Sequence, residues 1–169
     1  AIGLSSFGMR VSFHTALGND SEGESIISTL KQLNISTDNI TMIPSRETLT
    51  KIRFFGSRES LLDRGQILLQ ADRGTNEPVG DAISSELASS AMEDLEDSCA
   101  LVISDYDKGV VTIEESLKLI SKANKIGIPV IVDPKLTGLE KSRGASVVIF
   151  EKRGMSLLAR RIGSDIEEA

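Results

Sequence analysis

The sequence has 169 residues, 40% of them hydrophobic, and a formal net charge of −6, which is the composition of one ordinary globular domain. The negative charge argues against non-specific nucleic-acid binding, and no apolar stretch is long enough to cross a bilayer. The single cysteine, Cys99, excludes an intramolecular disulfide. Because no signal peptide is visible either, we expect a protein of the reducing cytoplasm.

The N-terminal part has the pattern of an α/β sheet. The first residues are typical of the end of a helix that stops at Gly8. Alternating side chains over residues 9–16 then predict a strand. A turn at residues 18–20 begins a helix whose apolar positions continue to Leu33. Strands that alternate with helices indicate a layered fold with parallel strands.

Residues 40–72 differ, because strand-like runs follow one another there without helices between them. We therefore predict an antiparallel flap over about this range. Lys51 and Arg53 alternate with Thr50 and Ile52, so both cations lie on one face of their strand. Such a pair can bind a phosphate or a carboxylate. The alternative is an ordinary solvated face. The strand-like runs are 40–43, 49–55 and 66–70.

A second sheet segment is predicted over about residues 99–150. Its helix begins at Thr112, with Glu115 in place to complete a capping box, and ends at Gly127. Apolar runs flank this helix on both sides, which is the pattern of a βαβ unit with two parallel strands. Wholly apolar strands are typical of a sheet covered on both faces. A third run, residues 147–150, is expected to be buried beside them.

Charged residues follow both predicted parallel strands, in the turns 104–109 and 133–135. In open parallel sheets, ligands bind beyond the carboxyl ends of the strands. Two charged turns on adjacent strands therefore predict a binding site at this edge. The alternative, for any one of these residues, is an ordinary solvated turn.

Several of these segments, in their order and spacing, resemble the ribokinase-like carbohydrate kinases, and among them the heptose 7-phosphate kinases. The resemblance covers nearly all of residues 1–150. It implies an α/β fold with a mainly parallel sheet, flanking helices and a small antiparallel flap, in one partial kinase domain over residues 1–169. The segments that carry it are 3–8, 18–20, 48–53, 104–109, 132–135 and 143–145.

The resemblance also implies a reaction, which is the phosphorylation of heptose 7-phosphate at its anomeric hydroxyl by ATP with Mg²⁺. It further implies a homodimer through the flap, and neither a nucleic-acid nor a membrane partner. In such kinases the flap closes over the sugar and the turns after the parallel strands line the cleft. The residues that the resemblance assigns to the substrate are Thr50, Lys51 and Arg53 in the flap, and Asp105, Tyr106, Lys108, Asp133 and Lys135 in the cleft.

The sequence also departs from the family pattern. The opening strand and the glycine-rich sugar-binding segment would precede Ala1. A further stretch would follow Phe150, and the Gly-Ala-Gly-Asp motif, whose aspartate is the general base, would follow Leu158. None of them is in this sequence, so we expect a truncated domain without a nameable catalytic base and inactive by itself. The alternative is a non-catalytic remnant or interaction module of the same fold.

Overall fold

The structure is a computed structural model that describes residues 1–56 and 66–162, the last two by their backbone alone. The chain divides into two compact units, Ala1–Asn76 and Glu77–Ala169, and each is described by itself. The assignment of the whole chain to one partial domain stays a prediction. None of the helices in the described part has the length and apolar composition that a membrane span requires.

The first unit contains a parallel strand pair with a helix between its strands. The helix α1 (Ile2–Ser6) precedes β1 (Thr15–Gly18), α2 (Ser21–Gln32) and β2 (Ile40–Ile43), and β1 pairs with β2 in parallel, Thr15 opposite Ile40. The predicted strand over residues 9–16 is wrong in its bounds. Alternation alone does not make a strand without a partner, and β2 offers partners only to residues 15–18.

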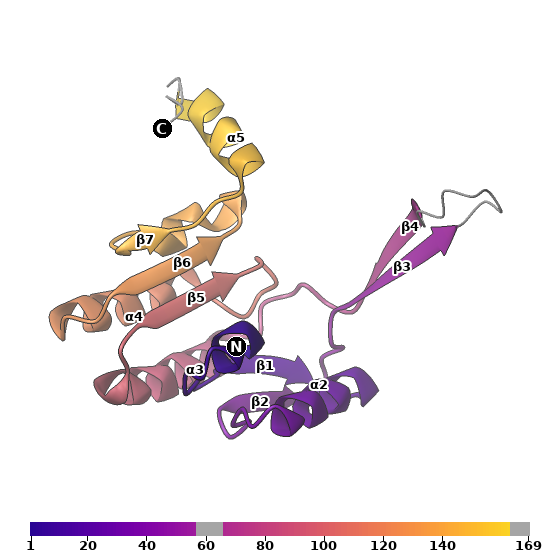
Figure 1. Cartoon of the computed structure of the whole chain (residues 1–169), viewed down its shortest axis with the longest axis horizontal. Coiled ribbons are helices and arrows are strands. Elements are labelled where there is room, and N and C mark those ends of the chain that lie inside the picture. The colour runs from indigo at the N-terminus through magenta and orange to yellow at the C-terminus, as the bar shows by residue number, and fades with distance from the viewer. Residues whose placement is uncertain (57–65, 163–169) are drawn as a thin grey trace. The chain divides into compact units, whose positions relative to one another are not determined.

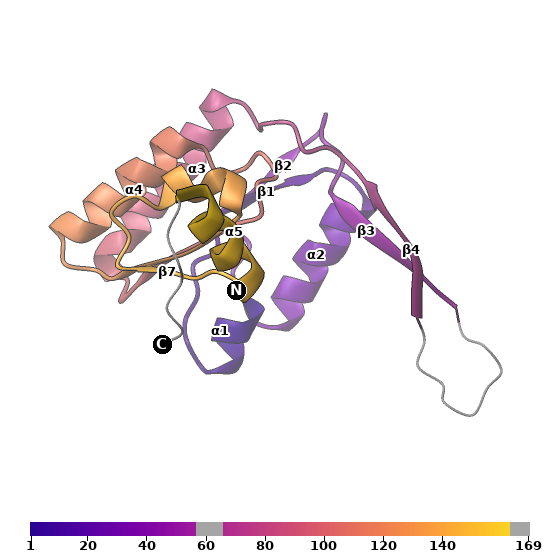
Figure 2. The same ribbon diagram turned by 90° about the horizontal axis from the view of Figure 1, so that it is seen from above.

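The first unit ends in a long hairpin, β3 (Thr50–Gly56) and β4 (Gln66–Arg73), which Figure 2 shows as a two-stranded antiparallel ribbon. The predicted flap is therefore confirmed as an antiparallel pair, but its start near residue 40 is wrong. Residues 40–43 belong to the parallel pair with β1. Periodicity identifies a strand but not its partner, which is why the sequence placed β2 in the flap.

The second unit is a three-stranded parallel sheet of β5 (Leu101–Asp105), β6 (Val130–Pro134) and β7 (Val147–Val148) in this order, with α4 (Ile113–Lys125) between β5 and β6 in the sequence (Figure 1). The predicted βαβ unit is confirmed as β5, α4 and β6. The Thr112 hydroxyl accepts from the Glu115 N–H at 3.2 Å, and Gly127 has the left-handed φ of 78° that favours glycine. The elements are α3 (Asp81–Asp94), η1 (Leu95–Asp97), β5 (Leu101–Asp105), α4 (Ile113–Lys125), β6 (Val130–Pro134), η2 (Leu136–Ser142), β7 (Val147–Val148) and α5 (Lys152–Ile162).

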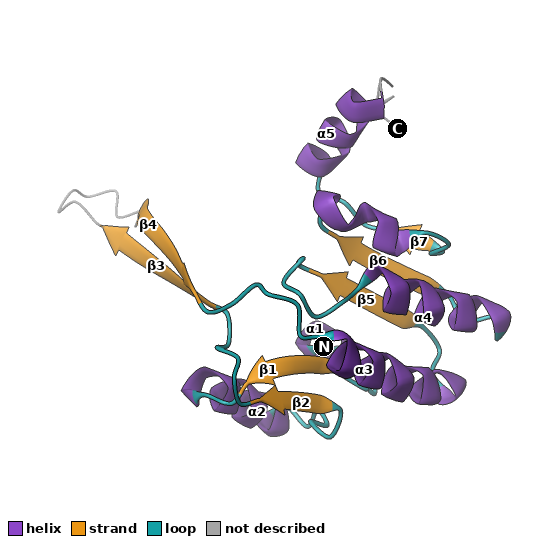
Figure 3. Ribbon diagram, turned by 180° about the vertical axis from the view of Figure 1, so that it is seen from behind, coloured by secondary structure: helices purple, strands orange, loops and turns teal. Residues whose placement is uncertain are grey.

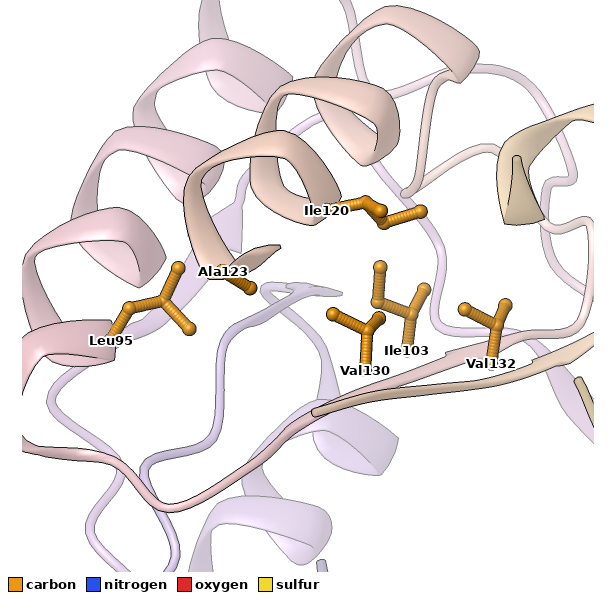
Figure 4. Packing of buried hydrophobic residues seen from close by; sticks show 6 residues of the cluster. All are labelled: Leu95, Ile103, Ile120, Ala123, Val130 and Val132. Carbon is orange, nitrogen blue, oxygen red and sulfur yellow. The ribbon is translucent and has the colours of Figure 1, made fainter. Parts of the chain in front are cut away.

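The core of the second unit lies between this sheet and α4, beside which α3 runs (Figure 3). Its side chains converge from α4, η1, β5 and β6 (Figure 4). Ala123, Val130 and Val132 have no exposed surface, so the sheet and helix are joined by fully desolvated aliphatic contacts. The cluster consists of Leu95, Ile103, Ile120, Ala123, Val130 and Val132.

The opposite face of the sheet differs from the prediction. Val102 is 45% exposed and Val147 is 50% exposed, so the described residues do not cover this face, and the run at residues 147–150 is not buried as expected. Apolar composition shows that a strand tolerates burial on both faces. It does not show what covers each face.

Shortening Ile120 to alanine tests the core. Ile120 is 2% exposed, so Ile120→Ala should lower the free energy of unfolding by about 2–5 kcal/mol, and Ile120→Val by about 0.5–1.5 kcal/mol. Urea denaturation followed by far-UV circular dichroism measures both. Ile113→Ala is the control, because Ile113 is 46% exposed on the same helix. Equal losses for Ile113→Ala and Ile120→Ala would contradict this packing.

Candidate functional site

The carboxyl ends of β5 and β6 lie at one edge of the sheet, as the sequence predicted. Ser104 pairs with Asp133 and Asp105 with Pro134 in the parallel register. Beyond the strands, the Lys135 N–H donates to the Asp105 carbonyl at 3.2 Å. The turns after the two strands are therefore adjacent, and we call this edge, residues 104–109 and 133–142, the rim.

A buried ion pair lies at the centre of the rim. Asp105 is 3% exposed and Lys141 is 8% exposed, and Lys141 Nζ lies 2.7 Å from Asp105 Oδ2. The backbone at Gly138 lies close to the Asp105 carboxylate, since a Cβ on Gly138 would be 3.0 Å from Asp105 Oδ2. Removing one partner of a buried ion pair lowers the free energy of unfolding by about 3–5 kcal/mol, because the other charge stays buried without a partner.

Asp107 joins the same cluster. Its N–H donates to Asp105 Oδ1 at 2.9 Å, and its own carboxylate lies 3.2 Å from Lys141 Nζ. The Thr137 hydroxyl donates to its other oxygen at 2.7 Å. We call these four residues the rim cluster. It ties the turn after β5 to the segment after β6. Of its members the sequence assigned only Asp105 to the site; it placed Asp107 in the charged turn 104–109 and missed Thr137 and Lys141.

The electrostatics keep Asp107 and Lys141 charged at neutral pH. The Thr137 hydroxyl, followed by Lys141, holds the pKa of Asp107 below its usual value. Burial by itself lowers the pKa of Lys141, but the hydrogen bonds and charges of Asp105 and Asp107 outweigh burial, so this pKa lies above its usual value.

The remaining predicted residues of the rim are more accessible. Tyr106 is 59% exposed, and Lys135 Nζ lies 5.0 Å from the centroid of its ring, within the range of a cation–π contact. Lys108 is half-buried, and Asp133 is exposed at the end of β6. The structure thus brings the cleft residues of the prediction to one edge, with Asp105 buried beneath the others.

The predicted flap residues lie in the first unit. Thr50 donates its hydroxyl to the Thr48 carbonyl at 3.1 Å. Lys51 Nζ is 4.0 Å from Asp72 Oδ2 across the hairpin, and Arg53 lies opposite Gln70. Lys51 and Arg53 occupy alternate positions of β3 and so share one face. That these residues and those of the rim bind one sugar together stays a prediction.

The other face of the hairpin is apolar and exposed. Phe54 (51% exposed) lies opposite Leu69 (58% exposed), and Ile52 shares their face. A register shift beside Phe54 inserts Leu68 into β4. A Cβ on Gly56 would come within 2.9 Å of Leu68 Cγ, so Leu68 lies over Gly56 on the same face. We call Ile52, Phe54, Leu68 and Leu69 the apolar hairpin face.

The base of the hairpin is held by Asp20, which is part of the segment 18–20 of the resemblance. Its carboxylate accepts from the Thr48 N–H at 2.7 Å and from the Gly23 N–H at 2.8 Å, and the Thr48 hydroxyl accepts from the Gly18 N–H at 2.9 Å. These N–H donors lower the pKa of Asp20. The segment therefore fixes both the start of α2 and the entry of the chain into β3.

The fold and the rim define a class of protein, and comparison with known sequences identifies it. The pfkB family of carbohydrate kinases matches residues 1–169, so the chain belongs to this family. Among solved structures, it is similar to 2-dehydro-3-deoxygluconokinase from Thermotoga maritima, with a TM-score of 0.68 at 15% identity over 99% of this chain and 52% of that one. It is likewise similar to fructokinase with bound ATP from Xylella fastidiosa, with a TM-score of 0.65 at 17% identity over 98% of this chain and 52% of that one. The predicted ribokinase-like α/β fold is thereby confirmed.

Particular relatives are found among the curated proteins. Bifunctional protein HldE of Sulfurimonas denitrificans is 31% identical over 150 residues, which are 89% of this chain and 30% of the relative. Bifunctional protein HldE of Paramagnetospirillum magneticum is 34% identical over 145 residues, which are 86% of this chain and 28% of the relative. The chain thus spans less than a third of the length of these relatives.

The lowered pKa of Asp107 predicts a specific acid dependence. Because the folded state binds this proton less tightly than the unfolded state, the carboxylate stabilises the fold above about pH 4, the ordinary pKa of aspartate. This stabilisation is lost as the pH falls through the lower pKa of the folded state. The Tm of Asp107→Asn should therefore lie below that of the wild type at pH 7, and the difference should shrink below pH 4. A difference that stays constant from pH 7 to pH 2 would contradict the role of the charge.

Proposed function

We propose that this chain is the sugar-binding part of an ATP-dependent kinase that converts heptose 7-phosphate to heptose 1,7-bisphosphate. The observation that carries the proposal is the gathering of Tyr106, Lys108 and Lys135 at the carboxyl rim of a chain of this kinase family. The rim cations suit the phosphate of the sugar. The choice of heptose rests on the resemblance of the motifs and on the similarity to the bifunctional proteins.

In the proposed reaction, the anomeric oxygen of the sugar attacks the γ-phosphorus of ATP. The bond between this phosphorus and the β,γ-bridging oxygen breaks, ADP leaves, and the hydroxyl proton passes to a general base. The resemblance assigns this base to a Gly-Ala-Gly-Asp motif that is not in the sequence, so we assign no base here. Phosphoryl transfer depends mostly on positioning and on charge stabilisation, and these are the contributions we assign to the rim.

ATP and Mg²⁺ enter as the proposed donor and its metal ion. Within residues 1–56 and 66–162, no three acidic, histidine or cysteine side chains are grouped to hold a metal ion. In phosphoryl transfer Mg²⁺ is held mainly by phosphates, water and one or two carboxylates, so in this proposal the nucleotide carries its own metal ion. We place the protein in the cytoplasm, in keeping with its single cysteine and a nucleotide donor.

The hairpin residues keep the role that the resemblance gives them. Arg53 and Lys51 share one face of β3 and are proposed to contact the sugar phosphate, with Thr50 at the base of the strand. To bind the phosphate, Lys51 would give up its ion pair with Asp72. This ion pair is weak, because the two groups are 4.0 Å apart and both side chains are exposed. The proposal therefore requires no buried interaction of the hairpin to break.

Titration by calorimetry tests the proposed substrate. The folded chain should bind heptose 7-phosphate, and Lys135→Met should weaken binding at least tenfold, because a charged hydrogen bond contributes about 1.5–3 kcal/mol. The control is Lys118→Met, which removes the charge of an exposed lysine on α4 that pairs with Glu114 and Glu115 and is not part of the rim. A parallel titration with an ATP analogue and Mg²⁺ measures nucleotide binding. A chain shown to be folded by circular dichroism that binds neither ligand would refute the proposal.

The second candidate is a non-catalytic interaction module, and the apolar hairpin face is the observation that favours it. Exposed aromatic and leucine side chains on an antiparallel pair are costly in water and are typical of interfaces. We propose a homodimer through this face. A homodimer through this face is compatible with sugar binding, because Lys51 and Arg53 lie on the opposite face of the hairpin.

Two adjacent phenylalanines allow a matched test of the dimer. Phe54→Asp places a charge on the apolar hairpin face and should shift the chain to a monomer in analytical ultracentrifugation. Phe55→Asp changes the neighbouring residue, which points to the other face and is 64% exposed, and should leave the dimer intact. A wild-type chain that is monomeric at high concentration would exclude the dimer.

A further inference from the structure

We propose that Lys141 is a positioning residue of the sugar-phosphate site. It holds the turn after β5 against the segment after β6, and thereby sets the places of Tyr106, Lys108 and Lys135. This inference rests on the proposed function, because those three residues are the ones assigned to the substrate. Lys141 itself contacts none of them in any interaction described above, and acts through Asp105 and Asp107.

The burial of Lys141 separates it from a substrate-binding lysine. Its side chain is 10% exposed, and its ammonium group is already shared between two carboxylates, at 2.7 Å and 3.2 Å. An incoming phosphate would have to displace a buried ion pair to reach it, which is costly. Lys135, by contrast, is exposed. The two lysines of this rim thus have different tasks, one internal and one facing the ligand.

Both ends of Lys141 are fixed. At the backbone, its carbonyl accepts from the Ser116 hydroxyl at 2.7 Å, and Ser116 has no exposed surface within α4. At the tip, the ammonium group contacts the residues on either side of Tyr106. Lys141 therefore connects the rigid helix of the βαβ unit to the turn that carries the substrate residues.

The turn needs such a restraint. Asp107 has a φ of 55°, a left-handed conformation that is uncommon for residues other than glycine and persists where surrounding contacts impose it. The contacts that impose it here come from Lys141, Thr137 and the Asp105 carboxylate. Without Lys141 the two carboxylates repel each other across a short distance, so the turn should change its conformation and take Tyr106 and Lys108 with it.

The sequence offers a direct probe, because Tyr106 is the only tyrosine and there is no tryptophan. The intrinsic fluorescence of the chain therefore reports on this turn alone. The experiment compares the wild type with three variants: Lys141→Met, Lys141→Arg, and a double variant that carries both Asp105→Asn and Lys141→Met. We call the double variant the neutral pair. The neutral pair guards against loss of the fold, since it leaves no unpaired buried charge. Lys118→Met is again the control.

Three readouts apply to each variant: far-UV circular dichroism, quenching of Tyr106 by acrylamide, and calorimetric titration with heptose 7-phosphate. We expect the neutral pair to keep its circular dichroism, to change the quenching constant by at least twofold and to bind at least tenfold more weakly, because Asp107 loses the ammonium group that helps to hold its left-handed conformation. Lys141→Arg should bind within about fivefold of the wild type, because its guanidinium keeps the charge between the carboxylates. Lys118→Met should match the wild type in every readout.

Other outcomes overturn the inference. A folded neutral pair with wild-type quenching and binding within twofold of the wild type would show that Lys141 only stabilises the fold. If the wild type itself does not bind the sugar phosphate, the proposed function fails separately. In that case the quenching of Tyr106 still decides whether Lys141 positions the turn, and an unchanged quenching constant would refute it.

Discussion

The second unit depends on one electrostatic constraint, the burial of the Asp105 carboxylate at the end of β5. A charge in this environment must be paired, and the partner is Lys141, which follows in the chain 36 residues later. To supply it, the chain beyond β6 folds back over the end of β5 as η2. The pair therefore couples α4, the strands β5 and β6 and both turns of the rim into one arrangement.

The first unit uses a carboxylate in a similar way. Asp20 follows β1, begins α2 and accepts from the N–H of Thr48 at the entrance to the hairpin. In each unit an acidic residue at the end of a parallel strand or just after it binds the chain's own groups, and exposed neighbours are left for other contacts. Segments that resemble binding motifs thus combine a structural residue with residues that are accessible to a ligand.

Local patterns predicted the local structure. The cap at Thr112, the stop at Gly127 and the βαβ unit follow from spacing within short segments, and the family follows from the order of several motifs. The partner of β2, the open face of the sheet and the role of Lys141 depend on contacts between distant segments, which have no periodic signal. The predicted rim already contained Lys108 and Lys135 beside its carboxylates, so no local signal pointed to Lys141.

The most direct test of the account is NMR mapping of heptose 7-phosphate on the folded chain. The account predicts that the signals of Tyr106, Lys108 and Lys135 shift together and saturate with one ligand, while those of Lys118 on the exposed side of α4 stay in place. Shifts confined to another part of the chain, such as the groove between α4 and Arg143, would contradict it, as would a folded chain whose signals do not change.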